Sequence, residues 1–381
     1  MLDNPFDTEE RVAFRETVRG FVEREIAPHV DEWDEAGEIP WELHQKVGAL
    51  GAFGFGVEER YGGLGFDDFF MRCIFGEEMG MCGAGGVPAA LGGRGISIGP
   101  IQKLASDEIK ERVLPPVVSG EKASSLAVTE PSGGSDVANL RTQARLDGNH
   151  YVLNGQKTFI TGGMNSDYFV VGARTGGEGL GGVSLFFVEA DTPGFSRSAI
   201  DRKMGWWCSD QATLYFDECR VPATNMLGPE NRGFYAIMDN FNAERLGLIA
   251  QALGMMKLCM RESLAWARER ETFGRPLIKR QVIQHKIVEM SARIDAVEAY
   301  MLRIAHAMQH GAQPIAELAK AKFYSTKALE WVASEAMQIF GGAGYLRGNL
   351  VERAYREVKV VAIGGGSEEI MRDLAATQMG L

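Results

Sequence analysis

The first segment whose residues could do chemistry is a loop rich in hydroxyls and glycines, Thr129-Glu-Pro-Ser-Gly-Gly-Ser-Asp136. Glycine lets a ligand approach the backbone closely, so the N–H groups of this loop could bond a phosphate or the polar edge of a flat ring. The hydroxyls of Thr129 and Ser135 could add further hydrogen bonds to such a ligand. The same composition is also that of an ordinary surface turn, and the loop alone leaves both interpretations open.

Phe159 and Thr161 offer a second kind of chemistry, because they stand two residues apart at the end of a strand-like pattern. Side chains at positions i and i+2 of a strand point to the same face, so a ring and a hydroxyl could stack on and hydrogen-bond one ligand together. An exposed strand end is the alternative interpretation. We expect the neighbouring Lys157 to be a charge at the strand end.

Other charged or titratable residues lie on predicted helices. Arg270 ends a long helical pattern, where a guanidinium could bind a diphosphate through bidentate bonds or only offset the helix dipole in solvent. His306 and His310 have the spacing of a metal-binding pair on one helix face, but the glutamate of the zinc-protease motif is absent. We expect these two histidines to be solvated or packed.

Bulk composition restricts the class of protein. The chain has 381 residues, 45% of them hydrophobic, which allows large cores and two to three domains. A net charge of −11 argues against nucleic acid or an anionic membrane as the main partner. Five cysteines without a Cys-x-x-Cys pair fit reduced thiols rather than disulfides or a zinc site. The acidic N-terminus resembles no targeting peptide and no apolar run reaches about 20 residues, so we expect a soluble, cytoplasmic protein.

The N-terminal third has helical patterns. Residues 7–28 carry an apolar stripe at helical period, with a capping box formed by Asp7 and Glu10. Residues 31–38 have the composition of a solvated turn, and residues 41–118 are expected to be helical segments broken by glycine clusters.

The pattern changes twice more along the chain. Residues 126–221 alternate apolar and polar positions around Asp-Gly and Asn-Gly turns, which predicts strands. No helical segment separates these strands, so a βαβ dinucleotide fold is disfavoured and an antiparallel barrel or sandwich is favoured. Helical patterns return over residues 231–270, 281–310, 314–340 and 350–378, as in an up-and-down bundle. The expected fold class is α+β multidomain, with an N-terminal helical domain (1–120), a central antiparallel β-barrel or sandwich (121–228) and a C-terminal four-helix bundle (229–381).

Two segments, Leu126-Ala-Val-Thr-Glu-Pro-Ser-Gly-Gly-Ser-Asp136 and Gln338-Ile-Phe-Gly-Gly-Ala-Gly-Tyr345, closely resemble the two signature motifs of the acyl-CoA dehydrogenase family. The order of the helical, β and bundle regions also follows the family, so the resemblance covers essentially the whole chain. It implies FAD as the cofactor and α,β-dehydrogenation of an acyl-CoA thioester to trans-2-enoyl-CoA as the reaction. It also implies an electron-transfer flavoprotein as the electron acceptor.

The resemblance singles out one carboxylate, because the family needs a base that takes a proton from the carbon next to the thioester. Most members carry it in a C-terminal Glu-Gly-(Thr/Ser) triplet, which here reads Gly365-Gly366-Ser367. A minority, the long-chain and isovaleryl-type members, carries the base on a helix of the C-terminal domain. This chain resembles that subgroup, because it has Asn242-Ala-Glu-Arg245 at the corresponding position. A Glu-Arg pair in a helix is otherwise most often a surface charge. The resemblance implies Glu244 as the base, the Gly365 N–H as a donor to the thioester oxygen, and Asn242 and Arg245 as groups that hold substrate or neighbouring backbone.

The resemblance also implies where FAD binds. The flavin would contact Leu126, Val128, Thr129, Gly134, Ser135, Phe159 and Thr161, as well as Ser367 and Glu369, with Ser135 also near the CoA chain. A further set would serve the flavin of a neighbouring subunit: Arg270, Thr272, Phe273, Gln281, Gln338, Gly341 and Gly342. The family usually has Trp or Tyr at position 159 and Asn at position 162, where this chain has Phe and Gly. A site shared between subunits implies a homotetramer built as a dimer of dimers.

The acyl group is less strongly indicated. By the resemblance, the helix that contains Pro88 and Gly92 forms the base of the acyl pocket, and these two residues replace longer polar side chains of medium-chain members. We therefore expect a deeper or wider pocket and a preference for long straight-chain or methyl-branched acyl-CoA over butyryl-CoA. Arg94 could close this pocket or bind a polar tail, and Trp206 and Trp207 could line a ligand groove or pack the β domain.

Two other classes of function remain open at this point. The chain could be an acyl-CoA-binding flavoprotein with other chemistry, such as an oxidase or a desulfinase, in which the dehydrogenation base is altered. It could also be a non-catalytic binding protein on the same fold. The retention of flavin-facing motifs together with Glu244 argues against the second class.

Overall fold

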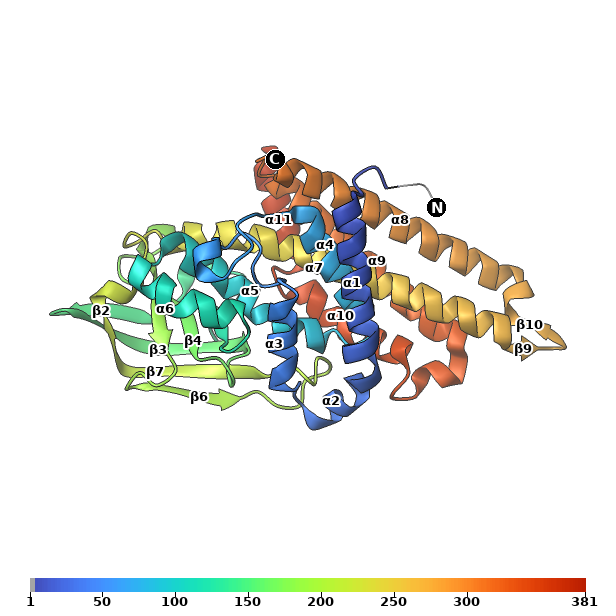
Figure 1. The fold of residues 1–381 in the computed structure, drawn as a ribbon, viewed down its shortest axis with the longest axis horizontal. Helices are drawn as coiled ribbons and strands as arrows, with labels where there is room; N and C mark the ends of the chain where they lie inside the picture. Colours follow the sequence, from blue (N-terminus) through green and yellow to red (C-terminus); the bar gives the residue numbers. More distant parts are fainter. Residues whose placement is uncertain (1–3) are drawn as a thin grey trace.

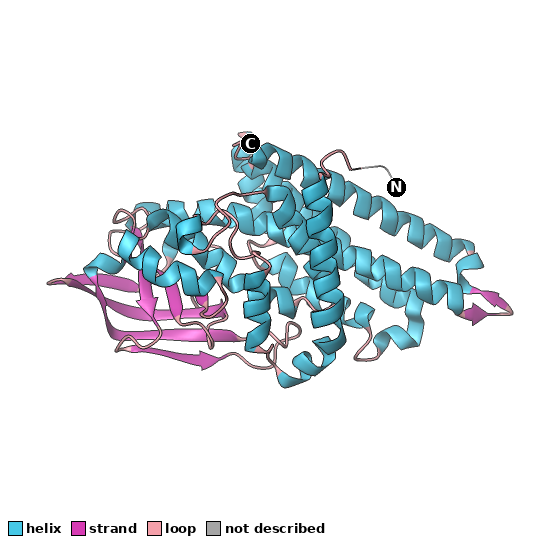
Figure 2. Ribbon diagram, in the orientation of Figure 1, coloured by secondary structure: helices cyan, strands magenta, loops and turns pink. Residues whose placement is uncertain are grey.

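The computed structural model describes residues 4–381, apart from the side chains of Gly93 and Arg94. A β sheet lies at one end of the elongated molecule and a small β9–β10 ribbon lies at the other, with long helices running between them (Figure 1). Nearly all strands gather in the sheet, and helices cover it from one side (Figure 2). Within the described part of the chain, no helix is long and apolar enough to cross a bilayer.

The N-terminal helices follow the predicted pattern, with one different cap. α1 begins after Thr8, whose side chain accepts a hydrogen bond from the Arg11 N–H, so the predicted capping box with Asp7 is wrong by one residue. The helix continues through one π turn and one 3₁₀ turn to His29. The remaining helices of this region are α2 (Val30–Ala36), α3 (Trp41–Ala49), α4 (Phe69–Gly80), α5 (Gly86–Leu104) and α6 (Asp107–Val118).

The solvated turn predicted for residues 31–38 is instead helix α2. Its Asp34 is buried and lies 3.0 Å from the Arg353 guanidinium, while its other oxygen accepts from the Cys208 N–H at 3.2 Å. The acidic composition suggested solvent, but a tertiary partner more than 300 residues away neutralises the charge.

The central sheet is mixed and open. Its strands are β1 (Ser124–Ala127), β2 (Gln143–Asp147), β3 (His150–Thr161), β4 (Tyr168–Arg174), β5 (Val183–Glu189), β6 (Phe195–Ala199), β7 (Gln211–Pro222) and β8 (Met226–Leu227). The order is β6-β7-β3-β2-β4-β5-β8, with β1 added parallel to β4. Most pairs are antiparallel, as expected, but β6 and β8 do not pair with each other, so the closed barrel was wrong.

Strand β4 is buried on both faces and separates two cores. Tyr168 and Val170 belong to the core shared with the N-terminal helices, whereas Phe169 and Val171 belong to a core formed with residues of β3 and β7. A strand buried on both faces reads as a continuous apolar run, which is why this segment shows no alternation. The first of these cores fixes the sheet against the helices that carry the site.

The C-terminal region is a helix bundle with one more break than predicted. Its elements are α7 (Gly233–Glu269), β9 (Glu271–Thr272), β10 (Arg275–Pro276), α8 (Gln281–Gln309), α9 (Ile315–Phe340), α10 (Leu350–Ile363) and α11 (Glu368–Met379). The single helix expected over 350–378 is divided because Gly365 and Gly366 have φ values of +66° and +107°. The backbone of other residues rarely adopts these values, so the glycines end one helix and let the chain turn into the next.

Candidate active site

Glu244 lies on α7 and is largely withdrawn from solvent, with only part of the residue exposed. Burial raises the pKa of its carboxyl to about 7, and the nearby positive charges of Arg245 and Lys322 oppose that rise. A carboxyl with a pKa near neutrality can accept a proton at physiological pH and release it again. The environment of Glu244 therefore differs from that of a surface charge, which was the competing interpretation of the sequence.

Glu244 and Gly365 lie next to each other, although 120 residues separate them in the chain. A Cβ atom built on Gly365 would lie 3.6 Å from Glu244 Oε1 and 2.5 Å from Leu248 Cδ1. The first distance means that a side chain at position 365 would share the space of the Glu244 carboxylate. The second means that Leu248 fills the volume that such a side chain would need.

Two buried cations hold the backbone around Gly365. Arg245 Nε donates to the Gly365 carbonyl at 3.3 Å, and its Nη1 donates to Asn242 Oδ1 at 3.2 Å. Lys322 of α9 donates through Nζ to the carbonyls of Ala362 at 3.2 Å and Gly366 at 2.5 Å. Arg245 thus binds neighbouring backbone, which is one of the two roles expected for it.

Lys322 was missed by the sequence reasoning. Its side chain is fully buried, and desolvation lowers its pKa to about 8. The available signal was its position in α9, where the neighbouring Leu318 and Ala319 are core residues. A lysine on an apolar helix face is also found with its ammonium group reaching solvent, so periodicity alone did not mark it.

A second buried lysine supports the hydroxyl-rich loop. Lys157 is fully buried, 2.7 Å from Glu130 Oε1, and also donates to the Val128 carbonyl at 3.1 Å. The expectation that it is a charge at the strand end was wrong. Glu130 also accepts the backbone N–H groups of Arg141 and Thr142, so this ion pair joins β3 to both ends of the loop.

The rest of the loop is exposed and has free donors. Glu130 and Gly133 exchange backbone hydrogen bonds and close a tight turn. Among the described residues, none accepts a hydrogen bond from the N–H groups of Gly134 and Ser135. Exposed, unpaired donors on a rigid loop fit the expected contact with the polar edge of a flavin or a phosphate.

Phe159 has an unusual backbone. Its φ is +57°, at an irregularity between Lys157 and Ile160 in the pairing of β3 with β7, and 65% of the residue is exposed. The bulge removes the regular alternation on which the shared-face prediction for Phe159 and Thr161 depended. A left-handed aromatic residue costs about 1 kcal/mol or more, so the protein spends stability to present this ring.

Thr161 follows on the same strand and remains available to a ligand. Its Oγ1 accepts a hydrogen bond from Gln211 Nε2 at 2.7 Å. The hydroxyl proton is therefore free to donate. An outward ring and a free hydroxyl fit a planar ring system such as the isoalloxazine of FAD.

The β-domain residues and Glu244 are connected through α7. A Cβ built on Gly172 would touch both Ile237 of α7 and Val128, and Leu126 and Phe241 pack on the same core. Ile237 precedes Glu244 by about 10 Å along the helix axis. Ser367 caps α11 by accepting the Ile370 N–H, and Glu369 is exposed one turn beyond Gly365. Leu126 and Val128 thus lie in the core that α7 shares, and Ser367 and Glu369 closely follow Gly365 in the chain.

The residues that are expected to serve the flavin of a neighbouring subunit lie in another part of the molecule. Arg270 is about 39 Å from Glu244 along α7, at the ribbon end of the molecule (Figure 1). Phe273, between β9 and β10, is 97% exposed, and Tyr345, in the turn after α9, is 82% exposed. The other members of the set are the partly exposed Thr272 and the exposed Gln281, Gln338, Gly341 and Gly342. One subunit therefore does not bring the two sets together.

The predicted acyl-pocket residues lie on α5. Pro88 is in its first turn and is partly exposed, and a Cβ on Gly92 would meet no atom within 4 Å. The side chain of Arg94 lies outside the described residues. α5 is held to α7 by Asn240, whose Nδ2 donates to the Ile96 carbonyl at 2.6 Å.

The two tryptophans pack between domains. Trp207 lies between the guanidinium groups of Arg347 and Arg356, which are 4.3 Å and 3.8 Å from its ring centre. The Trp206 N–H donates to Glu357 Oε1 at 3.1 Å. Of the two roles left open, these contacts provide packing between the β domain and α10.

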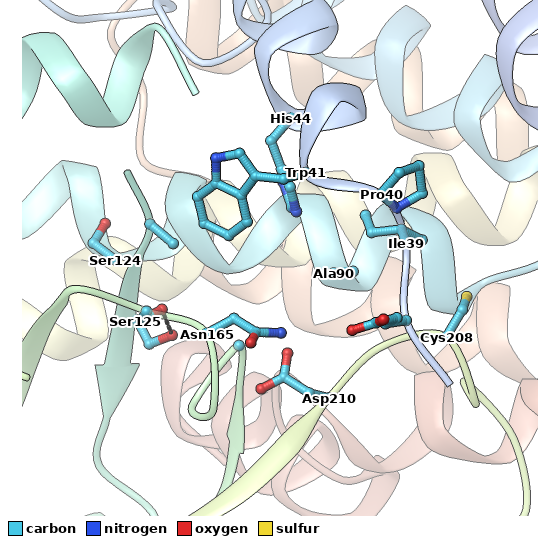
Figure 3. A pocket seen from close by; sticks show the side chains of 14 residues that line it. Ile39, Pro40, Trp41, His44, Ala90, Ser124, Ser125, Asn165, Cys208 and Asp210 are labelled. Atoms are coloured by element: carbon cyan, nitrogen blue, oxygen red, sulfur yellow. Dashed lines mark hydrogen bonds between the residues drawn. The ribbon is translucent and has the colours of Figure 1, made fainter. Parts of the chain in front are cut away.

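A cavity of about 190 Å³ lies between α3, α5 and β1 (Figure 3). Trp41 and Asp210 line it from opposite sides, but none of the predicted site residues does. Burial raises the pKa of Asp210, whose carboxylate accepts the Met164 N–H at 2.6 Å. This carboxylate fixes the turn after Thr161 rather than facing the candidate base.

The rings of His306 and His310 have their centres 4.3 Å apart at an interplanar angle of 53°, and among the described residues no group of three potential metal ligands is present there. All five cysteines are buried free thiols.

Comparison with known proteins identifies one family. The N-terminal, middle and C-terminal domains of acyl-CoA dehydrogenases match residues 8–121, 125–219 and 231–380. An acyl-CoA dehydrogenase of Bacillus subtilis is 36% identical over 96% of this chain and 96% of its own length. A 3-(aryl)acrylate reductase of Clostridium sporogenes is 34% identical over 98% of this chain and 99% of its own length. A solved structure from Mycobacterium smegmatis, assigned to the acyl-CoA dehydrogenases, is 46% identical, covers 99% of both chains and has a TM-score of 0.96.

Proposed function

Because the chain belongs to the acyl-CoA dehydrogenase family, we propose that it oxidises an acyl-CoA thioester to trans-2-enoyl-CoA with Glu244 as the base. The observation that carries this proposal is the 3.6 Å between Glu244 Oε1 and a Cβ built on Gly365. Most relatives in the family keep the catalytic carboxylate at the position of Gly365, and here a carboxylate from another helix occupies the same space. The protein is an oxidoreductase of this family.

The residues of the chain perform the proton chemistry. Glu244 takes the proton from the α carbon, and a pKa near 7 makes the carboxylate available as a base at neutral pH. The Gly365 N–H donates to the thioester oxygen, where negative charge grows as the proton leaves. FAD, the cofactor of the family, supplies the acceptor for the hydride of the β carbon when it is bound.

The β domain would hold the flavin. The free N–H groups of Gly134 and Ser135, the exposed ring of Phe159 and the hydroxyl of Thr161 would together form the polar and aromatic surface that contacts it. We assign Leu126, Val128 and Thr129 to the same surface, and Ser367 and Glu369 to its far side. Glu130 and Lys157 would keep this surface rigid.

We further propose a homotetramer in which Arg270, Gln281 and the 338–342 segment serve a neighbour's flavin. Their distance from Glu244 and the exposure of Phe273 and Tyr345 support this, because large apolar side chains are seldom left in water at such fractions. Arg270→Ala should then lower FAD retention. A stable monomer with full flavin occupancy in sedimentation would contradict the proposal.

The proposed substrate is a long straight-chain or methyl-branched acyl-CoA, and the proposed electron acceptor is an electron-transfer flavoprotein. Open space at Gly92 supports added apolar depth, and each methylene buried there contributes about 0.8 kcal/mol, close to fourfold in binding. Anaerobic bleaching of the flavin by a panel of acyl-CoAs tests this. An efficiency that peaks at four carbons and falls with chain length would refute it.

The position of the base has its own test. In a Glu244→Gln background, Gly365→Glu combined with Leu248→Ala should restore part of the flavin reduction, because the new carboxylate enters the same space and Leu248 no longer fills it. Leu248→Ala with Glu244→Gln is the matched control. No recovery in a folded, flavin-bound variant would argue that position 365 and Glu244 do not face the same carbon.

A second function is favoured by one comparison. The similarity to a 3-(aryl)acrylate reductase favours the reverse reaction, the reduction of an enoyl substrate, as a second candidate. The oxidase considered from the sequence would differ in its electron acceptor. The proposal therefore includes both the direction of the reaction and its electron acceptor. A dehydrogenase reduced by acyl-CoA reoxidises slowly in air, whereas an oxidase does so quickly and releases peroxide. Rapid peroxide release, or reduction of enoyl substrates without oxidation of acyl-CoA, would replace the proposed function.

A further inference from the structure

Lys322 is a buried cation without a carboxylate partner. Its side chain is fully buried in α9, and among the described residues no Asp or Glu oxygen lies within 4.0 Å of its Nζ. Its hydrogen bonds go to two carbonyls, those of Ala362 and Gly366. A buried ammonium group is costly, so its retention calls for a role that two carbonyl contacts alone do not provide.

The backbone that Lys322 holds is intrinsically soft. Gly364, Gly365 and Gly366 follow one another between α10 and α11, and glycine loses more conformational freedom on folding than any other residue. Arg245 holds the Gly365 carbonyl and Lys322 holds the carbonyls before and after the turn. The two cations therefore fix three peptide groups of a segment that has no side chains of its own to do so.

Lys322 also acts on the charge of Glu244. Among the described residues, the positive groups that act on this carboxyl are Arg245, on the same helix, and Lys322, on α9. Glu368 of α11 acts on Lys322 but is paired with Lys327 at 3.2 Å. No residue of the 364–367 turn carries a charged side chain.

Other charges near α7 have partners of their own. Lys103 of α5 pairs with Asp239 at 2.6 Å, and Glu77 of α4 pairs with Lys257 at 2.7 Å. Glu357 of α10 accepts two backbone N–H groups. Of the side chains that the structure describes, Lys322 is thus the positive charge on a neighbouring helix that acts on Glu244.

We propose that Lys322 is a positioning residue for the reaction: it fixes the 362–366 turn beside Glu244 and favours the ionised form of that carboxylate. The inference rests on the proposed role of Glu244. Its structural half, the anchoring of the turn, does not depend on which substrate is oxidised.

The test uses the flavin-loaded enzyme and Lys322→Met, with Lys320→Met as the matched control on the same helix, where the lysine pairs with Glu317 at the surface. Flavin reduction by the best acyl-CoA is followed from pH 5.5 to pH 9. Loss of the Lys322 charge should move the acidic limb of the rate profile to higher pH by about half a unit or more, because an opposite charge close to a carboxylate lowers its pKa. Lys320→Met should leave the limb in place, and Lys322→Arg, which keeps the charge, should move it less than Lys322→Met.

Hydrogen exchange supplies a readout that needs no turnover. Backbone N–H groups of residues 362–368 should exchange faster in Lys322→Met than in Lys320→Met. The inference would be overturned if an active Lys322→Met enzyme showed the wild-type acidic limb of the rate profile and the wild-type hydrogen exchange of residues 362–368. A wild-type enzyme whose flavin no acyl-CoA reduces would instead overturn the proposed function, and faster exchange in the variant would still support the anchoring role.

A second measurement covers the case in which Lys322→Met does not fold. Selective carbon-13 labelling of lysine lets the Lys322 ammonium be titrated in the wild type and in Glu244→Gln. Because Glu244 raises the pKa of Lys322, that pKa should fall below about 8 in the variant. An unchanged titration would show that the two groups do not interact and would refute the electrostatic half of the inference.

Discussion

Lys157 in the β domain and Lys322 in the C-terminal bundle are both fully buried beside a glycine-containing loop, where Lys157 donates to one backbone carbonyl and Lys322 to two. Lys157 has an ion-pair partner, Glu130, at 2.7 Å, and burial lowers its pKa to about 8 although the pair with Glu130 opposes that fall. Lys322 reaches a similar pKa without such a partner, and the carboxyl that opposes its desolvation is Glu244. The two lysines are thus equally buried, but among the described residues only Lys157 has a carboxylate within ion-pair distance.

The difference separates rigidity from reactivity. The Lys157–Glu130 pair neutralises itself, and Glu130 also accepts two backbone N–H groups, so the pair fixes the 129–136 loop. The charge of Lys322 acts on Glu244, whose pKa is near 7, so the group that fixes the turn beside Glu244 also acts on the proposed base. The carboxylate partner of Lys157 stays ionised near neutral pH, whereas the carboxyl that interacts with Lys322 titrates there.

Glu244→Gln tests the proposed role of Glu244 as the base and should have the largest effect. The substitution keeps the size of the side chain but removes proton acceptance, so flavin reduction by acyl-CoA should fall by at least about 100-fold. Folding and flavin content should remain normal, because Glu244 has no structural ion pair at 4.0 Å or closer within the described chain. Near-normal turnover in stopped-flow reduction would show that the base is elsewhere.

Glu130→Gln tests how much the buried Lys157–Glu130 pair contributes to the stability of the β domain. It leaves Lys157 buried without its partner, which should cost about 3–5 kcal/mol in the free energy of unfolding measured with urea. The matched control is Arg220→Met, which removes an exposed ion pair with Asp147 between strands of the same domain and should cost less than about 1 kcal/mol. Equal losses in the two variants would mean that burial of the Lys157 pair is unimportant.

The pH dependence of the wild type sharpens the contrast between the two lysines. Flavin reduction should increase about tenfold between pH 6 and pH 8, because only the ionised form of a carboxyl with a pKa of about 7 accepts the proton. Flavin retention should stay constant from pH 6 to pH 7, because interaction with Lys157 lowers the pKa of Glu130 below its usual value and the pKa of Lys157 is about 8. A flat rate profile would contradict the raised pKa of Glu244.

A smaller effect should appear in stability. The pKa of Glu244 rises from 4.5 to about 7 on folding, so its contribution favours the folded state below pH 4.5 and is lost as pH rises through 7. Glu244→Gln removes the carboxyl whose ionisation destabilises the folded state at high pH. The free energy of unfolding of the apoprotein at pH 8 should therefore be higher in the variant than in the wild type. Thermal unfolding of both proteins at pH 5 and pH 8 measures it, and a variant less stable than the wild type at pH 8 would contradict the sign.

Parts of the fold and site followed directly from local sequence. The strand pattern of residues 126–221 and the long helical patterns after Gly228 identified a β domain followed by a helix bundle. The cap of α1 was misplaced because Asp7 and Thr8 are both acceptable N-cap residues. The bulge at Phe159 was not visible, because its left-handed backbone is imposed by the pairing of β3 with β7 rather than by a glycine.

The sequence alone was enough to recognise the family and to notice that Gly365 stands where a carboxylate is usual and that Glu244 stands on a helix. Such motifs are contiguous, so residue type and spacing carry them. Only the tertiary structure put Glu244 beside Gly365, placed Lys322 and Arg245 around that turn, and gave Asp34 and Lys157 buried partners. Burial, pKa and charge pairing depend on groups that are distant in the chain, and folding is what brings those groups within a few ångströms of one another.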